Sequence, residues 1–162
     1  MPRSSRLLPA LTSLPLAVLL GACSGAVEVD VPDTDGPTRE ACTELLDALP
    51  GTLLGQDRVD VDPAEAPARA WGDPAVVLTC GVPAPVTDPD HLGCSIVEEV
   101  QWRLPGDSEL KDADADVVVT TIGHDPVVQV AVPAEDRQRF ADIAHELSAA
   151  LTEHTEITQE CI

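Results

Sequence analysis

Apolar residues recur at helical spacing in two stretches of the chain. In residues 38–49 one helical face is apolar, and Pro50 would end the helix. The apolar positions of this face are Ala41, Cys42, Leu45, Leu46 and Leu49. A second helix is expected after Pro133, since Glu135 and Asp136 would complement the positive end of its dipole. Its apolar stripe consists of Phe140, Ile143, Ala144, Leu147 and Leu151.

The stretch between the two helices has the patterns of β-strands. Residues 75–80 are apolar on both faces, which is typical of a central strand. Residues 99–104 alternate between apolar and polar side chains, so one face of this strand is expected to be buried. The inward positions would be Val100, Trp102 and Leu104, and the outward positions Glu99, Gln101 and Arg103. Residues 117–122 and 127–132 flank turn residues and predict a hairpin.

Residues 51–70 carry a weaker pattern and are expected to be largely irregular. A short strand is expected near residues 58–62 and a helical turn near residues 63–69. The order of helix, strands and helix predicts an α+β domain. We expect an antiparallel sheet of about four strands, covered by an N-terminal and a C-terminal helix.

The start of the chain has the organisation of an export signal. Arg3 and Arg6 precede an apolar run over residues 7–20, which ends in Leu20-Gly21-Ala22-Cys23. These four residues resemble the bacterial lipobox, where diacylglycerol and acyl chains such as palmitate are attached to the cysteine and the chain is cut before it. The apolar run would form only about 21 Å of helix, against a hydrocarbon core of about 30 Å. A cleaved lipoprotein signal therefore fits better than a membrane-spanning helix, and a cleaved signal without lipid is the alternative.

The chain is thus expected to have three parts. Residues 1–22 would be a lipoprotein signal peptide, residues 23–36 a flexible acidic tether, and residues 37–162 a single α+β domain. Acyl chains on Cys23 would hold the protein on the cell membrane, because each buried methylene contributes about 0.8 kcal/mol. The expected location is the outer face of the cytoplasmic membrane.

Acidic residues dominate the composition, with 29 acidic against nine basic residues and a formal charge of −20. Removal of residues 1–22 would leave seven basic residues and a formal charge of −22. Such a charge repels phosphate backbones, which excludes nucleic acid as a partner. The aromatic residues, Trp71, Trp102 and Phe140, are too few to build stacking platforms for sugars or bases.

Five cysteines are present, and four remain if Cys23 carries lipid. They are Cys42, Cys80, Cys94 and Cys161. An even number of cysteines in an exported chain predicts two disulfide bonds. Their spacing does not match a zinc site.

One block of the chain resembles a known family. Residues 70–83 read Ala-Trp-Gly-Asp-Pro-Ala-Val-Val-Leu-Thr-Cys-Gly-Val-Pro. They resemble the core of an actinobacterial secreted lipoprotein family known only as a domain of unknown function (domain of unknown function 3515). Shorter matches occur in the same order over residues 40–152: Cys42 with Leu45 and Leu49-Pro50, Gly55-Gln56-Asp57-Arg58, Val100-x-Trp102, Thr120-Thr121-x-Gly123 and Val128-x-Val130-x-Val132-Pro133. The resemblance implies export and lipid anchoring, with no assigned activity.

The resemblance also implies a disulfide pairing. Many family members keep two cysteines that match Cys42 and Cys80, which implies that these two are bonded to each other. Cys94 and Cys161 would then form the second bond by elimination. A bond between Cys80 and Cys94 is the alternative, because both residues could lie on neighbouring strands.

The Trp71-Gly72-Asp73-Pro74 motif has two interpretations. As a ligand site, it would offer an indole wall and a carboxylate. As a structural motif, Trp71 would close the edge of the core, Gly72 would allow a turn, Asp73 would bond nearby backbone and Pro74 would start a strand. We favour the structural interpretation.

Two groups of acidic residues are candidate cation sites. Asp112, Asp114 and Asp116 have the spacing that opens a calcium loop, but the glycine and glutamate that such a loop needs later are missing. Asp88 and Asp90 lie next to His91 and form the second group. We expect solvated acidic loops at both places, and no metal site.

His124 and His145 are the candidate acid–base groups, and both are expected at the surface. The sequence has no Gly-x-Ser-x-Gly motif, and disulfide-bonded cysteines cannot act as nucleophiles. We therefore expect no catalytic activity and no cofactor. The expected function is a non-catalytic binding or interaction module of the cell envelope, with an envelope protein as its partner. The alternatives are a small-molecule or cation-binding lipoprotein and, less favoured, a hydrolase.

Overall fold

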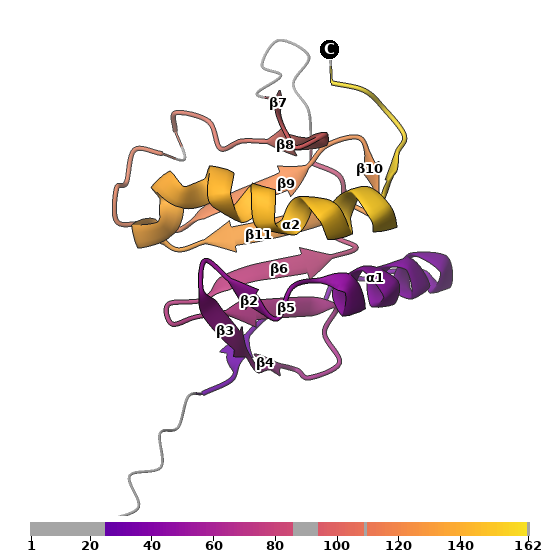
Figure 1. Cartoon of the computed structure of the whole chain (residues 1–162), viewed down its shortest axis with the longest axis horizontal. Coiled ribbons are helices and arrows are strands. Elements are labelled where there is room, and N and C mark those ends of the chain that lie inside the picture. Colours follow the sequence, from indigo (N-terminus) through magenta and orange to yellow (C-terminus); the bar gives the residue numbers. More distant parts are fainter. Residues whose placement is uncertain (1–24, 86–93, 109, 162) are drawn as a thin grey trace, which may run out of the picture.

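An eight-stranded antiparallel sheet runs through the molecule, with two helices packed on one of its faces (Figure 1). The computed structural model describes residues 25–85, 94–108 and 110–161. The strands are β1 (Val27–Glu28), β2 (Thr52–Leu53), β3 (Gln56–Val59), β4 (Val61–Asp62), β5 (Ala68–Trp71), β6 (Val76–Cys80), β7 (Cys94–Val97), β8 (Val100–Arg103), β9 (Val117–Thr121), β10 (His124–Asp125), β11 (Val128–Val132) and β12 (Glu156–Ile157). The helices are α1 (Gly36–Ala48), the 3-10 helix η1 (Ala134–Arg139) and α2 (Phe140–His154).

The sheet consists of two halves, each contiguous in sequence. Its strand order is β2-β3-β5-β6-β11-β9-β8-β7, so β6 and β11 join the halves at the centre. In that central pair Cys80 lies opposite Val128 and Val77 opposite Ala131. The first half follows α1 and the second half precedes α2. Each helix can therefore cover the half that is next to it in sequence, and the two helices also contact each other.

The core lies between the helices and the sheet. Leu78 and Cys80 of β6 point toward the helices and are buried, as expected from the alternation of side chains along a strand. The stripe of α2 is fully buried at Ile143, Leu147 and Leu151. Each of these aliphatic side chains contributes about 1.5–3 kcal/mol through its burial. The rings of Trp102 and Phe140 meet edge to face, with centroids 5.3 Å apart.

The fold class predicted from the sequence is correct, but the predicted number of strands is wrong. The sheet has eight strands instead of four. The strand β5 has the sequence Ala-Arg-Ala-Trp, which lacks β-branched residues, and β2, β3 and β7 are too short to show a period. The range 63–69, predicted as a helical turn, includes the first residues of β5.

The helices also differ from their predicted bounds. The helix expected as the first element is preceded by β1, and it starts at Gly36, two residues before the predicted start. Its N-cap is Asp35, whose Oδ1 accepts a hydrogen bond of 2.8 Å from the amide of Thr38. The second helix begins as the 3-10 turn η1 and becomes α-helical only at Phe140.

The segment predicted as a flexible tether, residues 23–36, differs from the structure at its described positions. The amides of Val27 and Val29 donate to the carbonyl oxygens of Asp60 and Asp62 at 2.8 and 2.9 Å, so β1 pairs with β4. Alternating valines in this segment are a strand signal that its acidic composition obscures. Together with side chains of β6 and β11, residues 28–32 border a hollow on the face of the sheet that points away from the helices.

Among the described residues, no helix combines the length and the apolar character that a membrane crossing needs.

Candidate functional site

Trp71 lies at a joint between α1 and the sheet. Its ring is 1% exposed, and its Nε1 donates to the carbonyl oxygen of Pro50 at 3.1 Å. The Nε of Arg58 donates to the same carbonyl oxygen at 3.0 Å, and the Nη2 of Arg58 donates to the carbonyl oxygen of Leu49. The guanidinium carbon of Arg58 is 5.9 Å from the centroid of the Trp71 ring. A ring so enclosed presents no wall to a ligand, which favours the structural interpretation of this residue.

The rest of the Trp71-Gly72-Asp73-Pro74 motif forms a largely exposed turn. Gly72 has a φ of +81° and donates its amide to the carbonyl oxygen of Asp57 at 3.1 Å. Asp73 and Pro74 are exposed. The indole of the motif is therefore buried and its carboxylate exposed, so the two do not offer a shared surface to a ligand.

Both disulfide bonds predicted from the sequence are present. Cys42 of α1 is bonded to Cys80 of β6, with 5.6 Å between their Cα atoms, and both residues are buried. Cys94 of β7 is bonded to Cys161, with 6.2 Å between Cα atoms. The alternative bond between Cys80 and Cys94 is wrong.

Residues 155–161 form a C-terminal strap, defined here as the chain that follows α2. The side chain of Gln101 holds the strap, since its Nε2 donates to the carbonyl oxygen of Gln159 at 2.9 Å and its Oε1 accepts from the amide of Cys161. The amide of Thr158 donates to the carbonyl oxygen of Gly123 at 2.7 Å. A side chain at position 123 would overlap the carbonyl oxygen of Gln159, so this close approach requires glycine. Gln101, predicted to face solvent, is buried under the strap.

His124 is buried, and its predicted surface position is wrong. Thr155 Oγ1 donates a hydrogen bond to the carbonyl oxygen of Leu151 at 2.7 Å, so it accepts a hydrogen bond from the Nδ1–H of His124 at 2.8 Å. The Nε2 of the ring is then free of a proton and accepts from the amide of Gln101 at 3.2 Å. Burial lowers the pKa of His124 below its ordinary value, in agreement with a neutral ring. The sequence could not indicate this, because the strap that encloses the ring comes from residues distant in the chain.

The remaining polar candidates that lie in the described part of the chain form no group that could hold a metal ion. His145 is exposed and lies 3.2 Å from Glu98. In the acidic loop, Asp112 accepts from the amide of Asp114 at 3.0 Å, and Arg137 donates to backbone carbonyls of the same loop. No group of three His, Cys, Asp or Glu side chains within residues 25–85, 94–108 and 110–161 could hold a metal ion.

Some predicted sites lie outside the described residues. These are Cys23 and the group formed by Asp88, Asp90 and His91.

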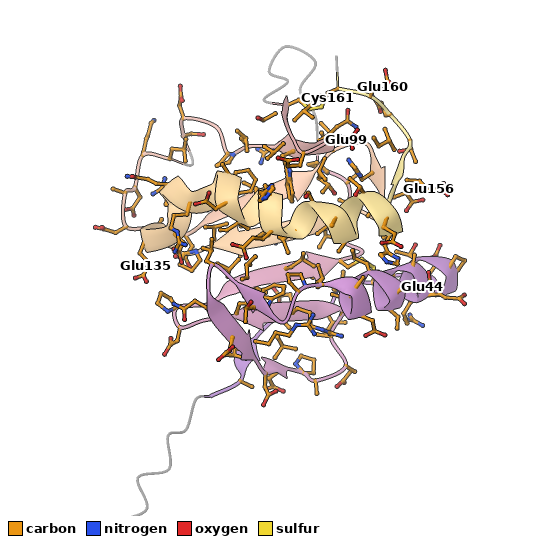
Figure 2. All side chains as sticks on the ribbon, in the orientation of Figure 1. Glu44, Glu99, Glu135, Glu156, Glu160 and Cys161 are labelled. Carbon is orange, nitrogen blue, oxygen red and sulfur yellow. A yellow bond between two sulfur atoms is a disulfide. The ribbon has the colours of Figure 1, made fainter. Side chains whose placement is uncertain are left out.

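Negative charge covers the surface of several elements. Figure 2 shows the labelled glutamates Glu44, Glu99, Glu135, Glu156 and Glu160 projecting at the periphery, from both helical and strand regions. All five are exposed. The acidic residues are thus distributed over several elements. Five of them line one cavity of about 460 Å³ between the start of α1 and the end of α2: Asp35, Glu44, Asp125, Glu153 and Glu156.

A cleft of about 640 Å³ lies between residues 31–34, α1 and the connection from β4 to β5. We call it the N-terminal cleft, since residues 31–34 form one of its walls. Its polar lining includes Asp33, Arg39, Glu65 and Arg69, and its apolar lining includes Leu46 and Pro67. The sequence analysis missed this site, because its walls come from three segments that no local pattern connects.

Comparison with family models places the chain in one family. The model described as "Protein of unknown function (DUF3515)" matches residues 12–159. The chain belongs to this family. DUF3515 carries no activity in its description, and neither the curated proteins nor the solved structures include a match to this chain.

The matched range of DUF3515 contains the separate motifs that the structure brings together. Leu49-Pro50, Gln56-Asp57-Arg58 and Trp71-Gly72 meet at the joint around the carbonyl oxygen of Pro50. Gly81, just after β6, packs closely against the N-terminal segment and α1, since a Cβ at this position would overlap Thr34 Cγ2 and lie 3.4 Å from the Cys42 sulfur. These DUF3515 motifs therefore fix α1 and the N-terminal segment to the sheet.

Proposed function

We propose that this protein is a lipid-anchored, extracytoplasmic binding module of the cell envelope. Acyl chains on Cys23 would hold it at the outer face of the cytoplasmic membrane after removal of residues 1–22. The lipobox-like Leu20-Gly21-Ala22-Cys23 supports this location, as do two disulfide bonds, which persist in oxidising environments. The family match covers residues 12–159, a range that includes Leu20-Gly21-Ala22-Cys23.

The pairing of β1 with β4 is the observation that carries the proposal. The strand β1 starts at Val27, four residues after Cys23. Four residues span at most about 14 Å, so a lipid on Cys23 would keep the folded domain close to the membrane surface. The same segment continues as a wall of the N-terminal cleft. Anchor and cleft are thus parts of one continuous stretch of chain.

A non-catalytic role agrees with the state of the candidate nucleophiles and bases. The four cysteines of the domain are oxidised in two disulfides, which removes them as nucleophiles. Both ring nitrogens of His124 are engaged in hydrogen bonds with the fold. His145 lies on the exposed side of α2, beside Glu98.

The anchor is tested by replacing Cys23 with serine and fractionating the cells. The wild-type chain should incorporate radiolabelled palmitate and stay with the membrane, whereas Cys23→Ser should do neither. The control is Cys94→Ser, which removes a different cysteine and should still be labelled. Equal membrane association and equal labelling of wild type and Cys23→Ser would contradict the anchor.

Binding at the cleft is tested by crosslinking in cells. A photo-crosslinking residue at Thr43, within the cleft, should capture a specific partner. The same residue at exposed Ala149, on α2, serves as the control and should not. Identical capture from both positions would contradict a binding role of the cleft.

A small-molecule-binding lipoprotein is the second candidate, and the size of the cleft favours it. Ligand pockets commonly have volumes of about 300–1,000 Å³, and the N-terminal cleft has about 640 Å³. The acidic loops give less support to a cation-binding function, because their described carboxylates and histidines do not form a group that could hold a metal.

A further inference from the structure

Guanidinium groups gather beside α1, although the chain after residue 22 has only seven basic residues. Arg39 and Arg69 line the N-terminal cleft. Arg58 and Arg69 line an adjoining hollow of about 540 Å³. The two cavities share Ala64 and Arg69 as lining residues, so three of the seven basic side chains line two neighbouring cavities.

The acceptors of these guanidinium groups are mainly neutral. Arg39 Nη2 donates to the carbonyl oxygen of Thr34 at 2.9 Å, and Arg69 Nη1 donates to the carbonyl oxygen of Ala68 at 2.9 Å. A backbone carbonyl fixes the orientation of a guanidinium without neutralising its charge. The carboxylate nearest to Arg69 is Asp47, at 3.5 Å and with a side chain 74% exposed, so water screens that pair strongly.

The guanidinium groups beside the N-terminal cleft also influence each other electrostatically. Burial is the main cause that lowers the pKa of Arg58, and the nearby positive charge of Arg69 lowers it further. Two like charges held close together are stabilised when an anion binds between or beside them. Arg139, by contrast, pairs with Asp136 at 3.3 Å on η1 and lies outside the cleft.

Apolar side chains form the remainder of the cleft. Leu46 is buried beneath it, and Ala66 and Pro67 line it from the connection between β4 and β5. Val31 and Pro32 form the opposite wall. A ligand that fills this cavity would therefore need an apolar part in addition to a charged head.

We propose that the N-terminal cleft binds a small organic anion, with an oxyanion head on Arg39 and Arg69 and an apolar part against Leu46 and Pro67. Carboxylates and phosphate monoesters share this chemistry, because both match the planar donor fork of arginine. The proposal deepens the binding function proposed above and rests on it. The carboxylates of Asp33 and Glu65 also line the cleft, and they oppose the anion from its rim.

The test uses probes that differ in the charge of their head. Hexyl phosphate, hexylammonium chloride and hexanol share a six-carbon alkyl tail, and sodium hexanoate has six carbons including its carboxylate carbon. Binding to the full chain, purified in a non-ionic detergent, is measured by saturation-transfer NMR at constant ionic strength. We expect hexanoate, hexyl phosphate or both to bind, and we expect no saturable binding of hexylammonium or hexanol. The relative affinity of hexanoate and hexyl phosphate identifies the preferred head.

Charge-changing variants place the anion in the cleft. Arg69→Gln should weaken binding about tenfold, as expected for the loss of a charge-assisted hydrogen bond. Arg139→Gln removes the same charge outside the cleft and should change the affinity by less than about twofold. Glu65→Gln, at an exposed position, should strengthen binding by about twofold, because it removes a repelling carboxylate.

Arg69→Gln and Glu65→Gln are expected to change the affinity for the anion in opposite directions. The proposal therefore stays testable even if Arg69→Gln fails to fold. Saturable binding of hexylammonium would identify a cation site and overturn the proposal. Weaker anion binding in Glu65→Gln would show that this carboxylate does not repel the ligand, and it would overturn the proposal as well. An equal loss in Arg69→Gln and Arg139→Gln would show a bulk charge effect and would also overturn it, as would the absence of binding by any probe. Failure here leaves palmitate labelling of Cys23 and capture from Thr43 unaffected, so the two proposals fail separately.

Discussion

Arg58 and Trp71 donate hydrogen bonds to the same acceptor, the carbonyl oxygen of Pro50, at 3.0 and 3.1 Å. The two residues are register partners on β3 and β5, and the guanidinium carbon of one lies 5.9 Å from the ring centroid of the other. Pro50 follows Leu49, the C-cap of α1. One carbonyl group thus ties the end of the helix to two adjacent strands and brings together three short motifs that are separated in sequence.

The contribution of the Trp71 hydrogen bond to the free energy of unfolding can be measured by comparing two tryptophans. Trp71 Nε1 has a partner, whereas Trp102 Nε1 is buried and has no hydrogen-bond partner among the described residues. Trp71→Phe should therefore destabilise the protein by about 1–2 kcal/mol more than Trp102→Phe, because only the first substitution removes a hydrogen bond. Urea unfolding followed by far-UV circular dichroism measures both. An equal or larger loss in Trp102→Phe would contradict the proposed role of the Pro50 carbonyl.

Local sequence patterns predicted the elements that carry their own signal. The hairpin of β9 and β11 consists of valine-rich runs on both sides of a turn, so its period is visible within a few residues. The strand β5 has no such signal. It is a strand because it pairs with β3 on one side and β6 on the other. Pairing of this kind is a tertiary effect that overrides the helix preference of alanine.

Of the candidate site residues, only the disulfide-bonded cysteines could be paired from the sequence. The cysteines could be counted and matched to the family, which gave both disulfide bonds. The environment of His124 depends on Thr155, 31 residues later in the chain. The cleft depends on Arg39 and Arg69, which local periodicity cannot relate to each other. Sites built from distant segments leave no mark in a short sequence window.

His124 should make stability depend on pH in the neutral range. Its pKa is lowered in the folded state, so the unfolded chain binds the proton more tightly and stability rises with pH. Stability should fall as the pH decreases through the unfolded value of about 6.5, since a protonated ring can no longer accept from Gln101. Each unit of difference between the two pKa values contributes about 1.4 kcal/mol. Urea midpoints between pH 7.5 and 5.5 measure this effect.

A comparison of two histidine variants tests whether His124 causes this pH dependence. His124→Gln should be less stable at pH 7.5 and should lose most of the slope. His145→Gln, at an exposed position, should keep the slope of the wild type. The carboxylates contribute equally to the pH dependence of stability in the wild type and in both variants. A wild-type slope that persists in His124→Gln would assign the pH dependence to other groups.

The two disulfide bonds should differ in their resistance to a reductant. Cys42 and Cys80 are 1% and 0% exposed, whereas Cys94 and Cys161 are half-buried. Thiol attack requires access to sulfur, so mild dithiothreitol should first reduce the bond between Cys94 and Cys161. Alkylation and peptide mapping identify the bond that opens. Earlier labelling of Cys42 or Cys80 would contradict the burial argument.

Loss of the outer bond should also lower stability. It closes a loop with a sequence separation of 67 residues, which corresponds to about 4 kcal/mol in the chain-entropy model. The double variant Cys94→Ser with Cys161→Ser should therefore unfold at a markedly lower urea concentration. An unchanged midpoint would show that the hydrogen bonds of Gln101 hold the strap without the disulfide.

Gly81 fixes the N-terminal segment to the domain through its lack of a side chain. It has a φ of +80°, and a Cβ at this position would overlap the Cγ2 methyl of Thr34. Gly55 has a φ of +79° and open space around the same position. Alanine at either site costs about 1–2 kcal/mol for the left-handed backbone. Only Gly81→Ala should in addition displace residues 31–34.

Hydrogen exchange at the amides of Val27 and Val29 reports this displacement, because both amides are bonded to β4 and its neighbour in the native protein. Their protection should fall sharply in Gly81→Ala and stay near the wild-type level in Gly55→Ala. The double variant Gly81→Ala with Thr34→Ser should recover protection, since serine lacks the methyl group that a new Cβ would meet. If Gly81→Ala and Gly55→Ala lose the same protection, or if Thr34→Ser gives no recovery, backbone strain and not the contact with Thr34 determines the effect. Recovery by serine would instead show that one methyl group decides whether residues 25–34 stay attached to the sheet.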